Sequence, residues 1–443
     1  MKRIASTTLC LLLATSLLPA LGGCARTFVA EDLMSDLPAD TLTERESERH
    51  LAVSDTPQPP KAGPAPEAQV PSTRNERIAD FAVNLLQHST PGDKNALVSP
   101  ASALSALAMT ANGAAGETRA QMENVLGLPV AELNDYLGGS AQTLEEQDGQ
   151  PLKLANSLWI KDDDSLAVDP AFLQANADYY GAGVFRAPFD ASTRDDINAW
   201  VSEHTDGMIP NIVDEIPSEA VLYLVNALAF DAKWQTPYRE TQVKDETFTL
   251  DGGETRRVRM MRSTEGTYLE DSDTTGFTKS YEGGRYSFVA LLPSEGKSLQ
   301  EYVTALSGVK LRALLDGATH ETVYASIPQF EGDFSMELSK ELAAMGMPDA
   351  FDPLRADFSD MGTFADSDLN LVVGSVVHKT YIAVDEHGTK AAAATSIGMN
   401  SAAASAEPAK PRTVTLDRPF VYLIVDHETD MPVFIGAVAD TGR

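Results

Sequence analysis

Apolar residues recur at helical spacing through much of the chain between residues 73 and 201. A first helix is predicted to begin after Thr73, because Glu76 stands at capping-box spacing from it. Ser99 and Pro100 are residue types that begin a second helix, which runs to Asn112. The apolar face of the first helix comprises Ile78, Phe81, Ala82, Leu85 and Leu86. Further helices are predicted over residues 118–126, 170–180 and 194–201, and a strand over 152–160.

The second half of the chain is rich in short apolar runs that predict strands. Residues 221–230 form a nearly continuous apolar run, which is typical of a strand buried on both faces. Helices dominate the first half and strands the second, without a repeat or an internal linker, so residues 73–443 predict one α+β domain with large antiparallel or mixed sheets. Other predicted strands are 246–250, 256–261, 286–292, 321–327, 369–377, 379–384, 420–425 and 433–438, with helices at 299–306 and 335–345.

Residues 384–406 contain no bulky residue that would anchor them in a core. Their alanine and serine content is typical of a flexible linker. Alternate positions differ, however, because one face of an extended chain would be small or polar and the other mostly apolar. The mostly apolar set is Thr389, Ala391, Ala393, Thr395, Ile397, Met399 and Ser401. This alternation predicts a strand that lies in a loop.

The first residues have the order of features of an export signal, with basic residues 2 and 3, an apolar stretch and then Leu21-Gly22-Gly23-Cys24. The apolar stretch is shorter than the roughly 20 residues that a membrane-spanning helix needs. The Leu-Gly-Gly-Cys string resembles the lipobox of bacterial lipoproteins. We therefore expect a lipoprotein signal peptide over residues 1–23 and a lipidated Cys24. An ordinary signal peptide that contains this cysteine is the alternative.

Residues 25–72 show little helical or strand periodicity, and residues 56–66 are rich in proline. Such a segment stays extended and unfolded. We therefore expect residues 24–72 to be a lipidated cysteine followed by a disordered tether that holds the domain away from a membrane. Cys10 lies in the segment that would be removed, so the mature chain would have one cysteine and no intrachain disulfide.

The chain has 65 acidic and 34 basic residues, a formal charge of −31, which repels phosphate and excludes nucleic-acid binding through a basic patch. Its histidines and cysteines lack the spacing of metal ligands, so neither a metal nor a cofactor is expected. Ser294 and Lys297 match the Ser-x-x-Lys of penicillin-interacting enzymes, but the partner motifs of that class are missing. A loop after a strand explains this string better than a hydrolase does.

Several strings along residues 73–443 resemble motifs of the serpin family and occur in the same order. They are Ser99-Pro100-Ala101-Ser102, Ala115-Gly116-Glu117-Thr118, residues 225–230 with Lys233-Trp234, His378-Lys379-Thr380, residues 386–395, and Asp417-Arg418-Pro419-Phe420 with Phe434-Ile435-Gly436. The resemblance implies the serpin fold, with about three β-sheets, one of them large and central, about eight or nine helices and an exposed reactive-centre loop.

In that family, a target serine protease attacks the reactive-centre loop and forms a covalent acyl complex. The hinge side of the loop then inserts into the central sheet as an extra strand. The resemblance therefore implies an irreversible inhibitor of serine proteases that is not an enzyme and is a monomer. The hinge residues by this resemblance are Glu386, Gly388, Thr389, Lys390, Ala391, Ala392, Ala393, Ala394 and Thr395.

The resemblance also assigns residues to the places where the sheet opens. Trp234 matches the point where insertion begins, and the strands part at Ser99, Ser102, Asn226 and His378. The family's usual loop spacing from Gly388 places the scissile bond at Ala402–Ala403, within one or two residues. Small residues around this bond suit an elastase-like or subtilisin-like protease.

A non-inhibitory serpin that acts as a binding or chaperone-like module is the alternative function. Such members typically carry bulky, charged or proline residues in the hinge, where this chain has Lys390 as its only charge. We expect the protein to be exported and lipid-anchored at the outer membrane, or at the cell surface or periplasmic face. Ala25 follows Cys24 in place of the aspartate that would oppose outer-membrane sorting in Gram-negative bacteria.

Overall fold

The structure is a computed structural model that describes residues 28–35, 73–90, 94–145, 151–180, 182–216, 220–365, 370–389 and 410–442. The predicted signal peptide, Cys24 and most of the predicted tether lie outside the described residues. Residues 390–409, which include the predicted scissile bond, lie outside them as well. Within the described part of the chain, no helix is long and apolar enough to cross a membrane.

Helices make up most of the described chain up to residue 204, as the sequence predicts. The α-helices are α1 (Arg74–Ser89), α2 (Pro100–Ala111), α3 (Gly116–Leu126), α4 (Val130–Glu145), α5 (Pro170–Tyr180), α6 (Ala191–His204), α7 (Leu299–Ala305), α8 (Gly308–Asp316) and α9 (Ser339–Met345). Within the described residues, the short 3-10 helices are η2 (Glu240–Gln242) and η3 (Pro348–Phe351).

The described strands form three large sheets and one small one, so the expected α+β class with one dominant sheet is confirmed. The eight-stranded sheet contains β1 (Glu31–Asp32), β5 (Gly183–Ala187), β3 (Leu152–Lys161), β6 (Leu222–Phe230), β16 (Val373–Val384), β17 (Gly388–Thr389) and β7 (Ala232–Lys233) in this order, with β14 (Phe330–Glu337) beside β16. The six-stranded sheet has the order β10 (Tyr268–Glu270), β11 (Thr274–Ser280), β12 (Tyr286–Pro293), β19 (Phe420–Asp426), β20 (Met431–Val438) and β2 (Ala96–Val98). The four-stranded sheet has the order β18 (Arg412–Thr415), β13 (Val323–Pro328), β9 (Thr255–Glu265) and β8 (Val243–Thr249), and β15 (Gly362–Phe364) pairs with β4 (Leu166–Val168).

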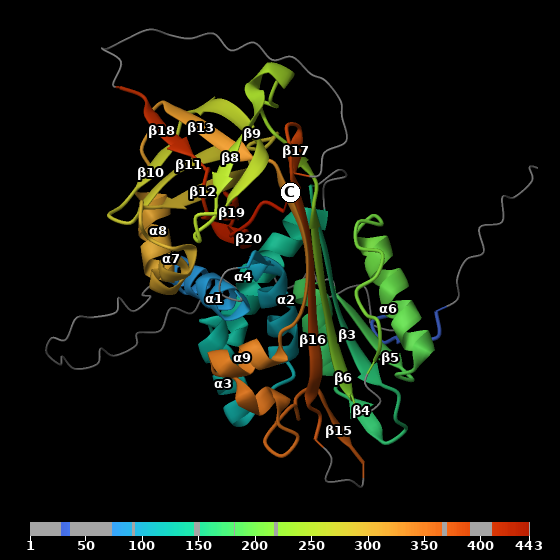
Figure 1. The fold of residues 1–443 in the computed structure, drawn as a ribbon. Helices are drawn as coiled ribbons and strands as arrows, with labels where there is room; N and C mark the ends of the chain where they lie inside the picture. Colours follow the sequence, from blue (N-terminus) through green and yellow to red (C-terminus); the bar gives the residue numbers. More distant parts are fainter. Residues whose placement is uncertain are drawn as a thin grey trace, which may run out of the picture.

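Figure 1 shows the eight-stranded sheet between two helical layers, with α1, α2, α3, α4 and α9 on one side and α6 on the other. Strand β6 lies in the middle of this sheet, and all nine of its residues are buried. Leu222 and Leu224 pack in the core that contains α1 to α4, whereas Tyr223 and Val225 pack in the core that contains Ile197 of α6. The continuous apolar run is thus explained by burial on both faces, as predicted.

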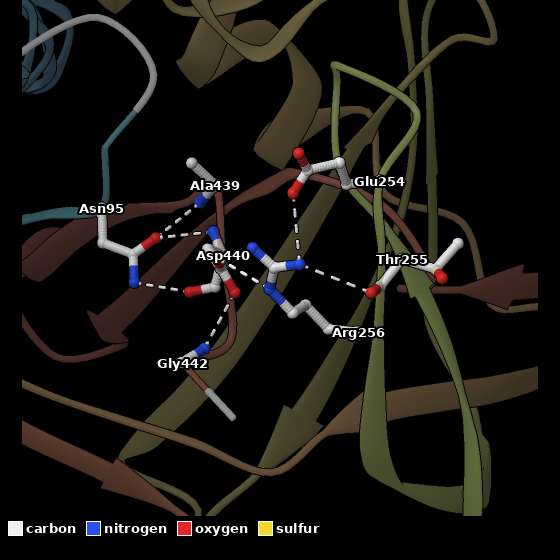
Figure 2. A network of polar contacts seen from close by, with 7 residues as sticks. All are labelled: Asn95, Glu254, Thr255, Arg256, Ala439, Asp440 and Gly442. Carbon is white, nitrogen blue, oxygen red and sulfur yellow. Dashed lines mark hydrogen bonds and ion pairs between the residues drawn. The ribbon is translucent and has the colours of Figure 1, made fainter.

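The C-terminal end of the chain is held by the network in Figure 2. The side-chain oxygen of Asn95 accepts hydrogen bonds from the backbone of Ala439 (2.7 Å) and Asp440 (2.8 Å). Its amide nitrogen donates to the carbonyl of Asp440 (2.6 Å). Arg256 on β9 then bridges the carboxylates of Asp440 (3.2 Å) and Glu254 (3.3 Å). These contacts tie the last residues to the start of β2 and to the β8–β9 hairpin.

Residues 28–35 correct the prediction of a wholly disordered tether. Strand β1 pairs antiparallel with β5, with Glu31 opposite Arg186, and so extends the edge of the eight-stranded sheet. The backbone N–H of Leu33 donates to the carbonyl of Val184 (2.9 Å). An edge strand offers unpaired backbone groups, and this segment satisfies part of that edge. The local sequence of Glu31 and Asp32 has no apolar pattern that would predict a strand.

Candidate functional site

The middle of the eight-stranded sheet contains a parallel pair, β6 and β16, matched from Leu222 opposite Val373 to Leu228 opposite Thr380. We call this line of contact the seam. The outer neighbours, β3 and β14, pair antiparallel with β6 and β16 respectively. Parallel pairing is slightly less stable per residue than antiparallel pairing. The seam is therefore the line at which this part of the sheet is easiest to separate.

At one end of the seam the chain turns back on itself. After Val384, the carboxylate of Asp385 accepts hydrogen bonds from the backbone of His387 (2.7 Å) and Gly388 (3.1 Å). Residues Gly388 and Thr389 then form β17, which is antiparallel to β16 on one side and to β7 on the other. Since β7 follows β6 in the chain, two residues of an additional strand already lie between extensions of the two seam strands.

Thr389 is fully buried at the end of the seam. Its hydroxyl is hydrogen-bonded to the hydroxyl of Tyr281 (2.7 Å), and the ring of Tyr281 stacks on Trp234 with centroids 4.5 Å apart. Burial raises the pKa of Tyr281, so its hydroxyl stays protonated as a hydrogen-bonding group. Gly388 is required beside it, because a Cβ there would lie 2.0 Å from the carbonyl oxygen of Ala232.

Trp234 lies where β17 begins, directly after β7. Its indole N–H donates to the carbonyl of Asp385 (2.8 Å), and its backbone N–H donates to the carbonyl of His387 (2.9 Å). The backbone carbonyl of Glu386 accepts from Tyr238 (2.9 Å), and the Glu386 carboxylate accepts from the side-chain amide of Gln329. The turn before β17 is therefore held from both sides.

Four of the predicted site residues meet at the middle of the seam. The backbone N–H of Ser99 donates to Nε2 of His378 (3.0 Å), so the neutral ring carries its proton on Nδ1 and donates to the side-chain oxygen of Asn226. The amide nitrogen of Asn226 donates to Asn156 on β3 (2.8 Å), which also accepts from the hydroxyl of Ser102 (3.4 Å). This chain of bonds crosses the seam between Asn226 and His378.

Sequence reasoning missed the partners that complete this arrangement. Asn156 lies within an ordinary strand pattern, and Tyr281 and Gln329 have no local signal that links them to the hinge. Lys279 is also buried there, with its ammonium 3.0 Å from Glu265 and 4.5 Å from the centre of the Tyr238 ring. Desolvation lowers the pKa of Lys279, and the Glu265 carboxylate opposes that shift.

Burial lowers the pKa of His378 from 6.5 to about 4. The unfolded chain therefore takes up this proton first on acidification, so the stability that the neutral ring contributes is complete above pH 6.5 and decreases as the pH falls from 6.5 toward 4. We expect a loss of about 2–3 kcal/mol of unfolding free energy from this residue between pH 7 and 4.5. Urea unfolding of wild type and His378→Gln at both pH values measures it.

The control for this prediction is His320→Gln, which replaces an exposed histidine. It should keep the wild-type dependence on pH, whereas His378→Gln should lose less stability than wild type on acidification. Equal losses in wild type and His378→Gln would show that the buried imidazole does not carry this dependence.

Ser294 and Lys297 occupy a turn after β12. The backbone N–H of Lys297 donates to the carbonyl of Ser294 (3.2 Å), and the Lys297 ammonium pairs with the carboxylate of Asp273 (2.9 Å). The pattern thus corresponds to a hydrogen-bonded turn at the end of a strand. Among the described residues, no group of three or more histidine, cysteine, aspartate or glutamate side chains could hold a metal ion.

This chain is similar to known proteins both in sequence and in structure. The family model described as serpin (serine protease inhibitor) matches residues 76–441. The leukocyte elastase inhibitor of Bos taurus is 33% identical over 390 residues, covering 83% of this chain and 98% of that protein. An uncharacterized serpin-like protein of Thermococcus kodakarensis is 32% identical over 367 residues, covering 81% of this chain and 84% of that protein.

Among solved structures, the native state of tengpin, a thermophilic serpin, is 39% identical with a TM-score of 0.78, covering 93% of this chain and 99% of tengpin. The latent state of tengpin gives a TM-score of 0.70 at 40% identity, covering 84% of this chain and 99% of that one. The family model and these relatives span most of the sequence, so the chain belongs to the serpin family of serine protease inhibitors, has the serpin fold and is not an enzyme.

Proposed function

We propose that this chain is an irreversible inhibitor that a serine protease activates by cutting the loop between β17 and β18. The observation that carries this proposal is β17 itself, which starts an antiparallel strand at the end of the seam. Residues that continue β17 along the seam would run antiparallel to both β6 and β16. The sheet would then exchange one parallel ladder for two antiparallel ones.

The chemical step is an ordinary acyl transfer. The serine hydroxyl of the protease attacks the carbonyl carbon of Ala402, its proton passes through the protease histidine to the leaving amine, and the bond to Ala403 breaks. Ala402 is then held to the protease as an ester, and Ala403 becomes a new amino terminus. Insertion of the freed segment moves the ester before water hydrolyses it.

The alternation of small residues suits this insertion. Thr389 faces the core that contains Tyr281, so Ala391, Ala393 and Thr395 would follow on the same face of an extended strand. Small side chains there would enter without overpacking. The thirteen residue steps from Thr389 to Ala402 span about 45 Å, which carries the attached protease far along the sheet.

The intact protein would persist because the seam must separate before the strand enters. Seven matched pairs of β6 and β16 residues, and the hydrogen bond between Asn226 and His378, have to part. An activation barrier thus prevents the more stable inserted state from forming, so the intact protein is kinetically stable. Cleavage removes the constraint that holds both ends of the loop, at β17 and β18.

Small residues around the proposed bond favour an elastase-like or subtilisin-like target. The four residues from Ser401 to Ala404 are serine and alanine, and no lysine or arginine occurs between Lys390 and Lys410. A shallow specificity pocket accepts such side chains, whereas a trypsin-like pocket requires a cation. The relative at 33% identity is named for inhibition of leukocyte elastase, which supports the same class of target.

Incubation with elastase or subtilisin should give a complex that survives SDS and has the summed mass, and mass spectrometry of the products should place the cut at Ala402–Ala403. Trypsin should give no such complex with the wild type. An Ala402→Arg variant is the matched test, because it should gain a trypsin complex and lose the elastase complex by roughly 100-fold. A cut loop with fully active protease would reject inhibition and favour a non-inhibitory binding module.

We also propose that the exported chain carries a lipid on Cys24 and resides at the outer membrane or cell surface. Its support is the Leu-Gly-Gly-Cys string and the absence of aspartate after Cys24. Membrane fractionation of wild type and Cys24→Ser provides the test, since only the wild type should sediment with membranes.

A further inference from the structure

Residues 28–35, which we call the docked strand, are held by two elements of the folded domain. Strand β1 pairs with β5, and the Glu31 carboxylate lies 3.6 Å from the guanidinium of Arg186. Leu33 and Met34 are half-buried against the main core. The segment is therefore attached through backbone pairing and through apolar contact.

The stronger attachment is to α6. One carboxylate oxygen of Asp196 accepts hydrogen bonds from the backbone N–H groups of Val29 (2.8 Å) and Ala30 (3.0 Å). Asp196 is only 2% exposed, so these bonds satisfy a buried charge. Bonds to a charged acceptor are stronger than neutral ones, and losing them would leave the carboxylate without these partners. The docked strand thus connects the edge of the sheet to the helix that covers it.

Docking shortens the chain between the domain and Cys24. Phe28 follows Cys24 by four residues, and Thr73, the start of the main domain, follows it by 49. A fully extended chain reaches about 14 Å over four residues and about 165 Å over 49. With the docked strand in place, the domain is held within about 14 Å of the modified cysteine.

Two exposed apolar side chains lie at that end of the docked strand. Phe28 is 38% exposed and Val29 is 60% exposed, and they are two of four large apolar residues that are exposed in the described part of the chain. The others, Tyr324 and Leu354, belong to distant segments. Aromatic and aliphatic side chains next to a lipid anchor add apolar contact with a bilayer.

We propose that the edge formed by the docked strand, β5 and α6 is the membrane-facing surface of this protein, and that its partner is the lipid bilayer that holds Cys24. This inference rests on the lipidation proposed above. It replaces the expectation of a long spacer, because the residues after position 35 no longer separate the domain from the membrane.

The orientation follows from the order of strands. β1 forms one edge of the eight-stranded sheet, and β5, β3, β6 and β16 separate it from β17, where the reactive loop begins. Five strand spacings amount to about 24 Å. In Figure 1 the docked strand, in dark blue, lies beside α6, and both ends of the loop lie at the top of the molecule. The two ends of the loop, at β17 and β18, thereby face the solution from which proteases approach and not the bilayer.

The test uses the lipidated full chain in vesicles that contain a headgroup acceptor dye. Lipidation occupies Cys24 and export removes Cys10, so one introduced cysteine carries the donor dye. Ala191→Cys places it at the start of α6, and Tyr324→Cys places it on β13. Energy transfer to the lipid should be at least roughly threefold higher from position 191 than from position 324, because the chain from Cys24 to Phe28 reaches only about 14 Å.

Two matched insertions test whether the docked strand causes the difference in energy transfer between the two dye positions. A Gly/Ser segment of about 20 residues, with a typical span of about 25 Å, is inserted either between residues 25 and 26 or between 50 and 51. The first should abolish the difference between the two dye positions, and the second should leave it unchanged. Asp196→Ala should act like the first insertion, whereas Asp196→Asn, which keeps an acceptor oxygen, should retain most of the difference.

The outcomes separate the two proposals. If Cys24 carries no lipid, both the proposed anchor and the proposed orientation are wrong, while the proposed inhibition in solution still stands. A lipidated chain in which both insertions act alike, or in which the two dye positions transfer equally, would overturn the orientation and leave the anchor standing.

Discussion

An Ala391→Arg variant should be cut by the target protease as fast as wild type and yet yield about 100-fold less covalent complex per cleavage. Position 391 follows buried Thr389 by two residues, so its side chain would face the core in an inserted strand. Burying an unpaired guanidinium costs several kcal/mol. An increase of about 3 kcal/mol in the activation free energy of insertion slows insertion by roughly 100-fold. The acyl-enzyme would then be hydrolysed before the strand enters, and the inhibitor would become a substrate.

Ala392→Arg is the matched control, because it adds the same side chain one residue away, on the face of Lys390. An inserted wild-type strand would already place the long cation of Lys390 on that face, so complex formation should remain within a few-fold of wild type. The measurement is the ratio of complex to cleaved inhibitor at increasing ratios of inhibitor to protease. Equal losses in both variants would show that the residues beyond Thr389 do not continue the alternation of β17.

Cleavage of the loop in the wild type should raise the midpoint of thermal unfolding by about 20 °C. Insertion of about a dozen residues makes roughly a dozen more backbone hydrogen bonds than it breaks, each worth about 1 kcal/mol net. A gain of 1 kcal/mol raises the midpoint of a large domain by about 2 °C. Scanning calorimetry of intact and protease-nicked protein measures the shift, without a stable protease complex being needed.

The Ala391→Arg variant serves this experiment as well. Its nicked form should show a much smaller rise than nicked wild type, since the same charge opposes insertion. If nicking leaves the midpoint of the wild type unchanged, the strand does not insert and the proposed mechanism is wrong. A rise of equal size in both proteins would instead place the stabilisation outside the seam.

The parts of the fold that could be predicted from sequence depend on local signals. Thr73 and Glu76 form the expected capping box, and Ser99 caps α2. Residues 335–337 show the limit of such signals, because they were predicted to begin a helix and instead belong to β14. They pair with residues 377–379 of β16, so partners 40 to 44 positions away decide their conformation.

Helix α4 was missed for a related reason. Its sequence contains Gly138 and Gly139, and each glycine in a helix costs about 1 kcal/mol. Burial of Leu133 and Leu137 outweighs this cost. A side chain at position 138 would lie 3.0 Å from the ring of Tyr179, so glycine permits the close approach of α4 and α5. Such a requirement is visible only once both helices are placed.

The candidate site likewise has features that local sequence predicts and features that depend on distant residues. The small alternating residues after Thr389 are a local property of the sequence, and they predict a strand without reference to any partner. The partners of the hinge are not local, since Tyr281 is 108 positions from Thr389 and Asn226 is 152 positions from His378. The docked strand was missed because its attachment depends on Asp196, more than 160 residues later.

The bonds of Asn95 also have a consequence for how the protein is made. They join residues 345 positions apart, and β2, at one edge of the six-stranded sheet, pairs with β20 at residues 431–438. Contacts between such distant segments form late, because a long loop must close first. A growing chain on the ribosome therefore lacks the partner of β2 until residues 431–438, more than 300 positions later, have been added.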